Sequence, residues 1–172
     1  MMHTLNLSVQ YADTTKNWMD VLPRPTLRRW VQSALQVNAT LTIRFVDEEE
    51  GRQLNAEFRG KDYATNVLTF TYDDELDDLP EEVRAAIAAE QGEQIEADII
   101  LCGAVLEREA TEQGKTIAEH AAHLVVHGVL HAQGFDHIED EEAEIMEGLE
   151  RQIVMKLGFS DPYLELAADS TN

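Results

Sequence analysis

The most informative stretch of this 172-residue chain is His127-Gly128-Val129-Leu130-His131-Ala132-Gln133-Gly134-Phe135-Asp136-His137. Apolar residues at helical spacing predict a helix over residues 116–133, from which His127 and His131 project on one face, one turn apart. Gly134 can adopt a positive φ where this helix must stop, so the chain can turn back and bring His137 toward the other two histidines. Three neutral imidazoles and a water molecule are the ligands of a catalytic zinc ion.

The spacing of these histidines and of Gly134 is that of the metzincin proteases, but one catalytic group is missing. Those proteases place a glutamate, their general base, directly after the first histidine, where this chain has Gly128. The motif therefore predicts the zinc geometry without the known protease machinery. His120 and His123 precede the motif on the same helix, and we assign them no ligand role because their spacing suits a supporting or surface position equally well.

Apolar periodicity in the rest of the chain predicts an α+β fold. Strands are expected over residues 4–10, 41–46, 67–72 and 97–102, and further helices over residues 25–35, 48–58, 104–113 and 140–157. Asp47, with Glu50 three residues later, resembles a helix cap. We expect residues 1–172 to form a single domain with a small mixed four-stranded sheet packed with helices, a zincin-like arrangement of the metal-binding helix, and a loose tail over residues 159–172.

The net charge of −21 lies in the second part of the chain. Residues 1–72 hold eight basic and eight acidic side chains, whereas residues 73–172 hold five and 26. This balance excludes the usual basic nucleic-acid-binding module. The acidic run over residues 73–82 is expected to be a solvated loop that leads into a helix, and the run over residues 139–150 is expected to be the wet face and negative first turn of a helix.

Basic residues are concentrated before residue 72, and they form a positive face only if the fold brings them together. The alternative is that they are scattered, solvated side chains. The set is Arg24, Arg28, Arg29, Arg44, Arg52, Arg59 and Lys61. A single cysteine, Cys102, excludes an intramolecular disulfide, the start of the chain lacks a signal-peptide pattern, and no apolar stretch approaches the length of a membrane span. We therefore expect a cytoplasmic protein with no membrane partner.

The chain resembles the YbeY-type endoribonucleases, which mature ribosomal RNA in bacteria. The family motif His-Gly-x-Leu-His-x-x-Gly-Tyr/Phe-Asp-His is similar to residues 127–137, and the acidic segment 138–146 continues the likeness. Residues 54–59 look like the family's Asn…Arg segment. Residues 64–70 look like its Thr-Asp-Val-Leu-Ser-Phe segment, although Asn66 and Thr69 replace the Asp and Ser, and Ala97 stands where the family has the Gly of a Gly-Asp-Ile strand.

The resemblance implies a zinc-dependent, single-strand-specific endoribonuclease with one zinc ion per chain. Its metal ligands would be His127, His131 and His137, and its catalytic residues Arg59 and His127. Arg59 matches the family's functional arginine, and its guanidinium stays ionised and can pair with a phosphate. The implied substrate is single-stranded rRNA at the 3′ end of the small-subunit rRNA, with a role in ribosome quality control and the ribosome or its small subunit as partner. No DNA partner is expected, and no general base is evident.

Two alternatives remain open at this point. The first is a ribosome-associated assembly factor whose zinc is structural and whose activity is weak or depends on a partner. The second, which Gly128 disfavours, is a zinc metalloprotease. A zinc ion with four protein ligands would favour the assembly factor, because closed zinc sites are structural.

Overall fold

The structure is a computed structural model that describes residues 4–72, 80–91, 94–135 and 139–163. Its elements follow one another along the chain as β1 (Leu5–Tyr11), α1 (Trp18–Val21), α2 (Arg24–Ala34), β2 (Asn38–Val46), α3 (Glu48–Arg59), β3 (Val67–Thr71), α5 (Glu81–Gln91), β4 (Gln94–Cys102), α6 (Gly103–Gln113), α7 (Ile117–Ala132) and α8 (Asp140–Lys156). The predicted α+β class is confirmed. The short helix α1 was not predicted from the sequence, and most of the first acidic run lies outside the described residues.

The four strands form one mixed sheet, as predicted, and their order in the sheet is β1-β2-β4-β3. β1, β2 and β4 are parallel, whereas β3 runs antiparallel to β4 and places Phe70 opposite Asp98. β2 and β4 begin earlier than their apolar alternation predicted, because their polar first residues, Asn38 and Gln94, pair with each other. The edge strand β3 lies at the far side of the sheet from β1.

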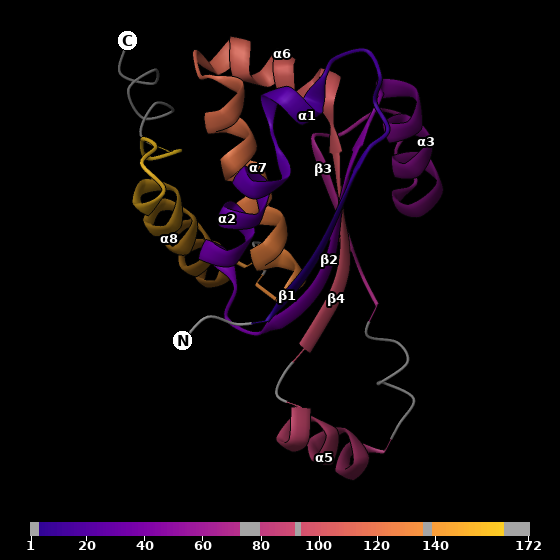
Figure 1. Cartoon of the computed structure of the whole chain (residues 1–172), viewed down its shortest axis with the longest axis vertical. Coiled ribbons are helices and arrows are strands. Elements are labelled where there is room, and N and C mark those ends of the chain that lie inside the picture. Colours follow the sequence, from indigo (N-terminus) through magenta and orange to yellow (C-terminus); the bar gives the residue numbers. More distant parts are fainter. Residues whose placement is uncertain (1–3, 73–79, 92–93, 136–138, 164–172) are drawn as a thin grey trace.

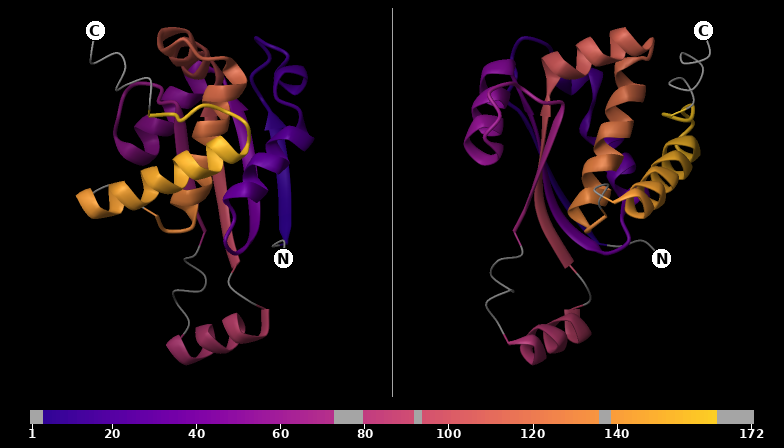
Figure 2. Two further views of the ribbon diagram at one scale, coloured as in Figure 1. Left: turned by 90° about the vertical axis from the view of Figure 1, so that its left-hand side faces the viewer. Right: turned by 180° about the vertical axis from the view of Figure 1, so that it is seen from behind.

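Helices cover both faces of the sheet (Figure 1). α3 lies on one face, whereas α2 and α7 lie on the other, with α8 as an outer layer over α7 (Figure 2). α7 is buried at ten of its sixteen positions, which is typical of a helix that is apolar nearly all round and packed inside the molecule. The larger apolar core lies between this helix layer and the sheet and includes Trp30, Phe45, Ile99 and Leu130.

Two glycines fix the position and the length of α7. A Cβ atom placed on Gly128 would lie 3.1 Å from Ile99 Cγ2 on β4, so a larger residue would fit here only if the Ile99 side chain shifted by a few tenths of an ångström. Gly134 has a φ of 100°, and its positive φ follows directly after the last turn of the helix, as predicted. At the other end the Thr116 hydroxyl accepts a hydrogen bond from the Glu119 backbone N–H at 3.1 Å.

The first five residues of the predicted loose tail, 159–163, are described and pack against the helices. Phe159 meets Trp30 edge to face, and the Lys115 ammonium group donates to the Pro162 carbonyl. The rest of that tail lies outside the described residues. Within the parts of the chain that the structure describes, no helix combines the length and the apolar content needed to cross a membrane.

Candidate metal centre

His127 and His131 lie one turn apart on α7, with nearly parallel rings whose centroids are 6.3 Å apart. His131 Nδ1 lies 3.1 Å from the Phe135 carbonyl oxygen, and His127 Nδ1 lies 2.5 Å from Glu150 Oε1. Both partners are acceptors, so each Nδ1 carries the proton and donates it. This arrangement fixes the tautomer in which Nε2 has the lone pair, as metal-binding histidines require.

The third predicted ligand, His137, and its neighbour Asp136 lie outside the described residues. Among the residues that are described, no group of three His, Cys, Asp or Glu side chains is placed to hold a metal ion. The described part of the centre is therefore the pair His127 and His131, and the role of His137 stays a prediction. Gly134 and Phe135 precede His137 in the chain, and the Phe135 carbonyl oxygen accepts a hydrogen bond from the ring of His131.

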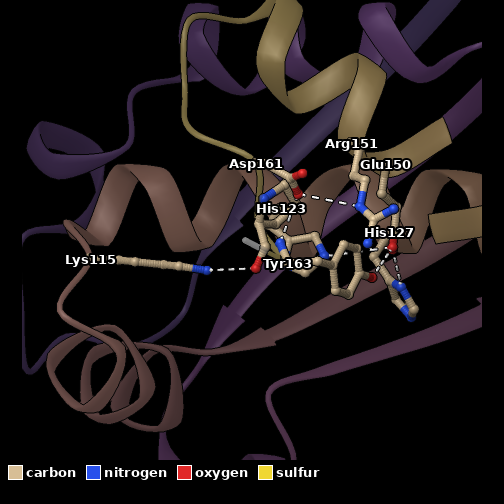
Figure 3. Close-up of polar contacts among 8 residues, drawn as sticks. Lys115, His123, His127, Glu150, Arg151, Asp161 and Tyr163 are labelled. Atoms are coloured by element: carbon tan, nitrogen blue, oxygen red, sulfur yellow. Dashed lines mark hydrogen bonds and ion pairs between the residues drawn. The ribbon is translucent and has the colours of Figure 1, made fainter. Parts of the chain in front are cut away.

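Glu150 of α8 is the buried carboxylate behind His127, and sequence reasoning missed it (Figure 3). Its Oε1 accepts from His127, its Oε2 accepts from the Tyr163 hydroxyl, and His123 Nε2 lies 3.7 Å from Oε2. Burial raises the pKa of Glu150, but the contacts with His123, His127 and Tyr163 outweigh burial and lower the pKa to about 2. Glu150 is therefore an ionised hydrogen-bond acceptor for His127.

The acidic run over residues 139–150 was predicted to be a wet helix face, and Glu150 corrects that prediction, since it is only 1% exposed. The spacing of apolar residues in the sequence did indicate that Glu150 is buried. Met146, Glu150 and Val154 follow one another at intervals of four, and all three are buried. A glutamate in an apolar stripe indicates a buried carboxylate with partners.

A cavity of about 640 Å³ brings Arg59 together with the two histidines. α3 contributes Phe58 and Arg59, α7 contributes His127 and His131, and the rest of the wall is Thr65, Asn66, Val67, Leu68, Thr69 and Phe70. Arg59 is the last residue of α3, which ends at Gly60 with a φ of 70°. Its side chain is exposed, and no carboxylate among the described residues pairs with it, so its charge is available to a ligand in the cavity.

The other arginines of the first part of the chain do not join Arg59 in one positive face. Arg44 pairs with Glu50 at 2.7 Å, and Arg52 pairs with Asp62 at 2.8 Å. Arg24 and Arg28 donate to backbone carbonyls of β1, at the sheet edge opposite β3. The alternative of scattered basic side chains therefore describes the fold.

Buried polar contacts hold the loop that forms the cavity wall. Asn55 of α3 is buried and donates from Nδ2 to the Tyr63 carbonyl at 2.7 Å. Asn66 donates from Nδ2 to Glu109 Oε1 at 3.0 Å, and the same oxygen lies 2.9 Å from His120 Nε2. The hydrogen bond with His120 lowers the pKa of Glu109 more than burial raises it. An amide at position 66 suits this neighbour, because an aspartate would meet the Glu109 carboxylate with no proton to donate.

Comparison with known proteins places the fold and the site in context. The family model described as "Endoribonuclease YbeY" matches residues 9–158. A protein named endoribonuclease YbeY from Herminiimonas arsenicoxydans is 58% identical over 161 residues, which are 94% of this chain and 96% of that protein. One from Janthinobacterium sp. (strain Marseille) is 55% identical over 162 residues, with the same two shares.

A solved structure supports the same fold. The solution structure of TM1509 from Thermotoga maritima has a TM-score of 0.53 and 24% sequence identity, and the match covers 95% of this chain and 93% of that one. At this identity the likeness concerns the fold alone. The family match and the similarity to the two sequence relatives, each extending over almost the whole chain, are independent of it, and they show that this chain belongs to the YbeY endoribonuclease family.

Proposed function

We propose that this chain is a zinc-dependent endoribonuclease that cuts single-stranded RNA in the cavity between α3, β3 and α7. The observation that carries the proposal is that one cavity is lined by Arg59 and by the paired histidines His127 and His131, which come from distant parts of the sequence. Membership of the endoribonuclease family supports RNA as the substrate.

The donor set of the cavity suits a zinc ion. His127 and His131 each donate from Nδ1 to an oxygen, so their Nε2 atoms would be the ones that bind the metal, and His137 would supply the third imidazole. When bound there, zinc would lower the pKa of a water molecule toward neutrality and polarise a phosphodiester oxygen. Imidazoles also suit other transition metals, so metal analysis is part of the test.

The side chains around this centre have distinct tasks. Arg59 presents a planar fork of donors to the phosphate and keeps its charge at any working pH. Phe58 is 59% exposed and meets Phe70 edge to face, and both line the cavity, so they offer flat surfaces on which unpaired bases stack. The protease alternative loses support because Gly128, the residue after His127, carries no carboxylate to act as the general base and is packed against Ile99 of β4.

The natural substrate and setting follow from the family resemblance. We propose that the chain acts in the cytoplasm on rRNA, at the 3′ end of the small-subunit rRNA, and that it takes part in ribosome quality control with the ribosome or its small subunit as partner. No DNA substrate is expected.

The substitution Arg59→Ala tests the proposal. We expect it to leave the bound zinc unchanged and to lower kcat/KM for a single-stranded RNA by about 100-fold, because one donor to a developing anion is lost. Zinc is measured by elemental analysis and cleavage with a fluorescently labelled oligoribonucleotide. Arg52→Ala is the matched control, since Arg52 is exposed on the same helix but pairs with Asp62.

His127→Ala is expected to remove both zinc and cleavage. Cleavage that survives Arg59→Ala at the wild-type rate would contradict the role of Arg59. If metal analysis and spectroscopy then showed a zinc ion with four protein ligands, the assembly factor with structural zinc would be the better description.

A further inference from the structure

Residues 159–163, which we call the C-terminal strap, lie across α7 and α8 and end beside the metal centre (Figure 3). Arg151 of α8 holds the strap by two contacts: its Nε lies 3.4 Å from Asp161 Oδ1, and its guanidinium lies 5.1 Å from the centre of the Tyr163 ring. Lys115 donates to the Pro162 carbonyl at 3.2 Å. These contacts fix where the side chain of Tyr163 lies.

The strap presents one hydroxyl group to the carboxylate behind His127. Tyr163 donates from its hydroxyl to Glu150 Oε2, while Glu150 Oε1 accepts from His127 Nδ1. A carboxylate with both oxygens bonded to groups on different elements cannot rotate without breaking one of the bonds. The orientation of the His127 ring is thereby coupled to the hydroxyl of Tyr163.

His123 is a second possible hydrogen-bond partner for the Glu150 oxygen that the Tyr163 hydroxyl occupies. His123 Nε2 is buried, has no hydrogen-bond partner among the described residues, and lies 3.7 Å from Glu150 Oε2, which is beyond hydrogen-bond distance. Without the Tyr163 hydroxyl, Oε2 would lose its donor, and a small rotation of the carboxylate would bring it to His123. That rotation would move Oε1 away from His127.

We propose that Tyr163 is a positioning residue for the metal centre: it holds the Glu150 carboxylate in the orientation that fixes His127, and so sets how tightly the chain binds zinc. Tyr163 acts through Glu150 and not on the substrate. The proposal rests on the proposed function for the identity of the metal. The C-terminal strap would then tune zinc affinity as well as pack against the helices.

The experiment measures zinc affinity by competition with a chromogenic chelator in full-length variants. Tyr163→Phe keeps the ring and its contact with Arg151 but removes the hydroxyl, and we expect the zinc Kd to rise about three- to tenfold. Glu150→Gln should raise it by about 10- to 100-fold, the range found when the partner of a metal-binding histidine is replaced. Because Tyr163 acts through Glu150, the double variant should bind zinc no more weakly than Glu150→Gln alone.

Tyr72→Phe is the matched control. Its hydroxyl also donates to a carboxylate, that of Asp98, but at the β3–β4 edge of the sheet and away from Glu150. The zinc Kd of this variant should equal that of the wild type. A Kd for Tyr163→Phe equal to the wild-type value, or effects of Tyr163→Phe and Glu150→Gln that add fully in the double variant, would overturn the proposal.

A second readout needs no metal. In the zinc-free protein, the Nδ1 proton of His127 should give a protected, downfield NMR signal that Tyr163→Phe broadens or shifts and Tyr72→Phe does not. A wild-type chain that binds no zinc would overturn the metal centre of the proposed function, and this signal would still decide whether Tyr163 positions His127. An unchanged signal would overturn the positioning role.

Discussion

Asp13 is a buried carboxylate whose two oxygens organise the turn after β1. Oδ1 accepts from the Thr15 backbone at 3.0 Å and from its hydroxyl at 2.6 Å, and Oδ2 accepts from Trp18 Nε1 at 2.9 Å. Gly103 leaves the space for them, because a Cβ there would lie 2.5 Å from the Trp18 ring. Burial raises the pKa of Asp13, but the hydrogen bonds outweigh burial and hold the pKa below its usual value.

Asp13→Ala is therefore expected to lower the free energy of unfolding by about 1–3 kcal/mol, since it leaves the buried indole N–H of Trp18 without an acceptor. Folding lowers the pKa of the Asp13 carboxyl. The stability that Asp13 contributes is therefore fully present above the pKa that this carboxyl has in the unfolded chain, near 4, and it is lost as the pH falls from there through the lower pKa of the folded state. Urea denaturation of zinc-free protein between pH 7 and pH 3.5 measures both effects. Asp20→Ala, at an exposed carboxylate, is the control, and an equal loss in the two variants would refute the assignment.

Glycines in and after the helices have opposite expected effects, which depend on their backbone. Gly134 ends α7 with a φ of 100°, and the space that a Cβ atom would enter is open, so Gly134→Ala changes only backbone strain. We expect it to lower the free energy of unfolding by about 1 kcal/mol. Thermal denaturation of zinc-free protein measures this loss, and an unchanged midpoint would show that the helix end relaxes freely.

Gly148 lies inside α8, also with open space where a Cβ atom would lie. Gly148→Ala should therefore raise the free energy of unfolding by about 0.5–1 kcal/mol, because alanine loses less conformational freedom in a helix than glycine does. The same thermal denaturation checks the sign. A loss of stability would show that this part of α8 is not helical in solution.

Local sequence patterns predicted the elements other than the short helix α1, but they could not predict which side chains meet between elements. Asp47 caps α3 as its spacing with Glu50 predicted, with the Glu50 N–H 2.8 Å from Asp47 Oδ1. Gly134 ends α7 for the reason read from the sequence. The bond from His127 to Glu150 spans 23 residues and joins two helices, so neither helix alone could reveal it. Position 66 is similar, since Asn66 and its partner Glu109 on α6 lie 43 residues apart in the sequence.

At the scale of the whole molecule, the fold brings α7, from the acidic second part of the chain, next to α3 and β3, from the neutral first part. The excess negative charge belongs to residues 73–172, yet α7, from that part, places His127 and His131 in one cavity with Arg59. The carboxylates of the first turns of α5 and α8 lie on other elements than those that line the cavity. An RNA strand can therefore approach along β3 and at the end of α3 that carries Arg59, away from the acidic first turns of α3, α5 and α8.

This distribution predicts that RNA binding depends only weakly on salt. Few phosphates can be neutralised, so a plot of log K against log[salt] for a single-stranded oligonucleotide should have a slope between about −0.7 and −2, and Arg59→Ala should make it shallower by about 0.7. Fluorescence anisotropy with a non-cleavable RNA from about 50 to 300 mM salt measures the slope. Arg29→Ala, at an exposed arginine of α2 near the opposite sheet edge, removes the same charge and should leave the slope unchanged. A slope steeper than about −4, or equal changes in both variants, would mean that RNA follows a broader basic surface than the cavity beside Arg59.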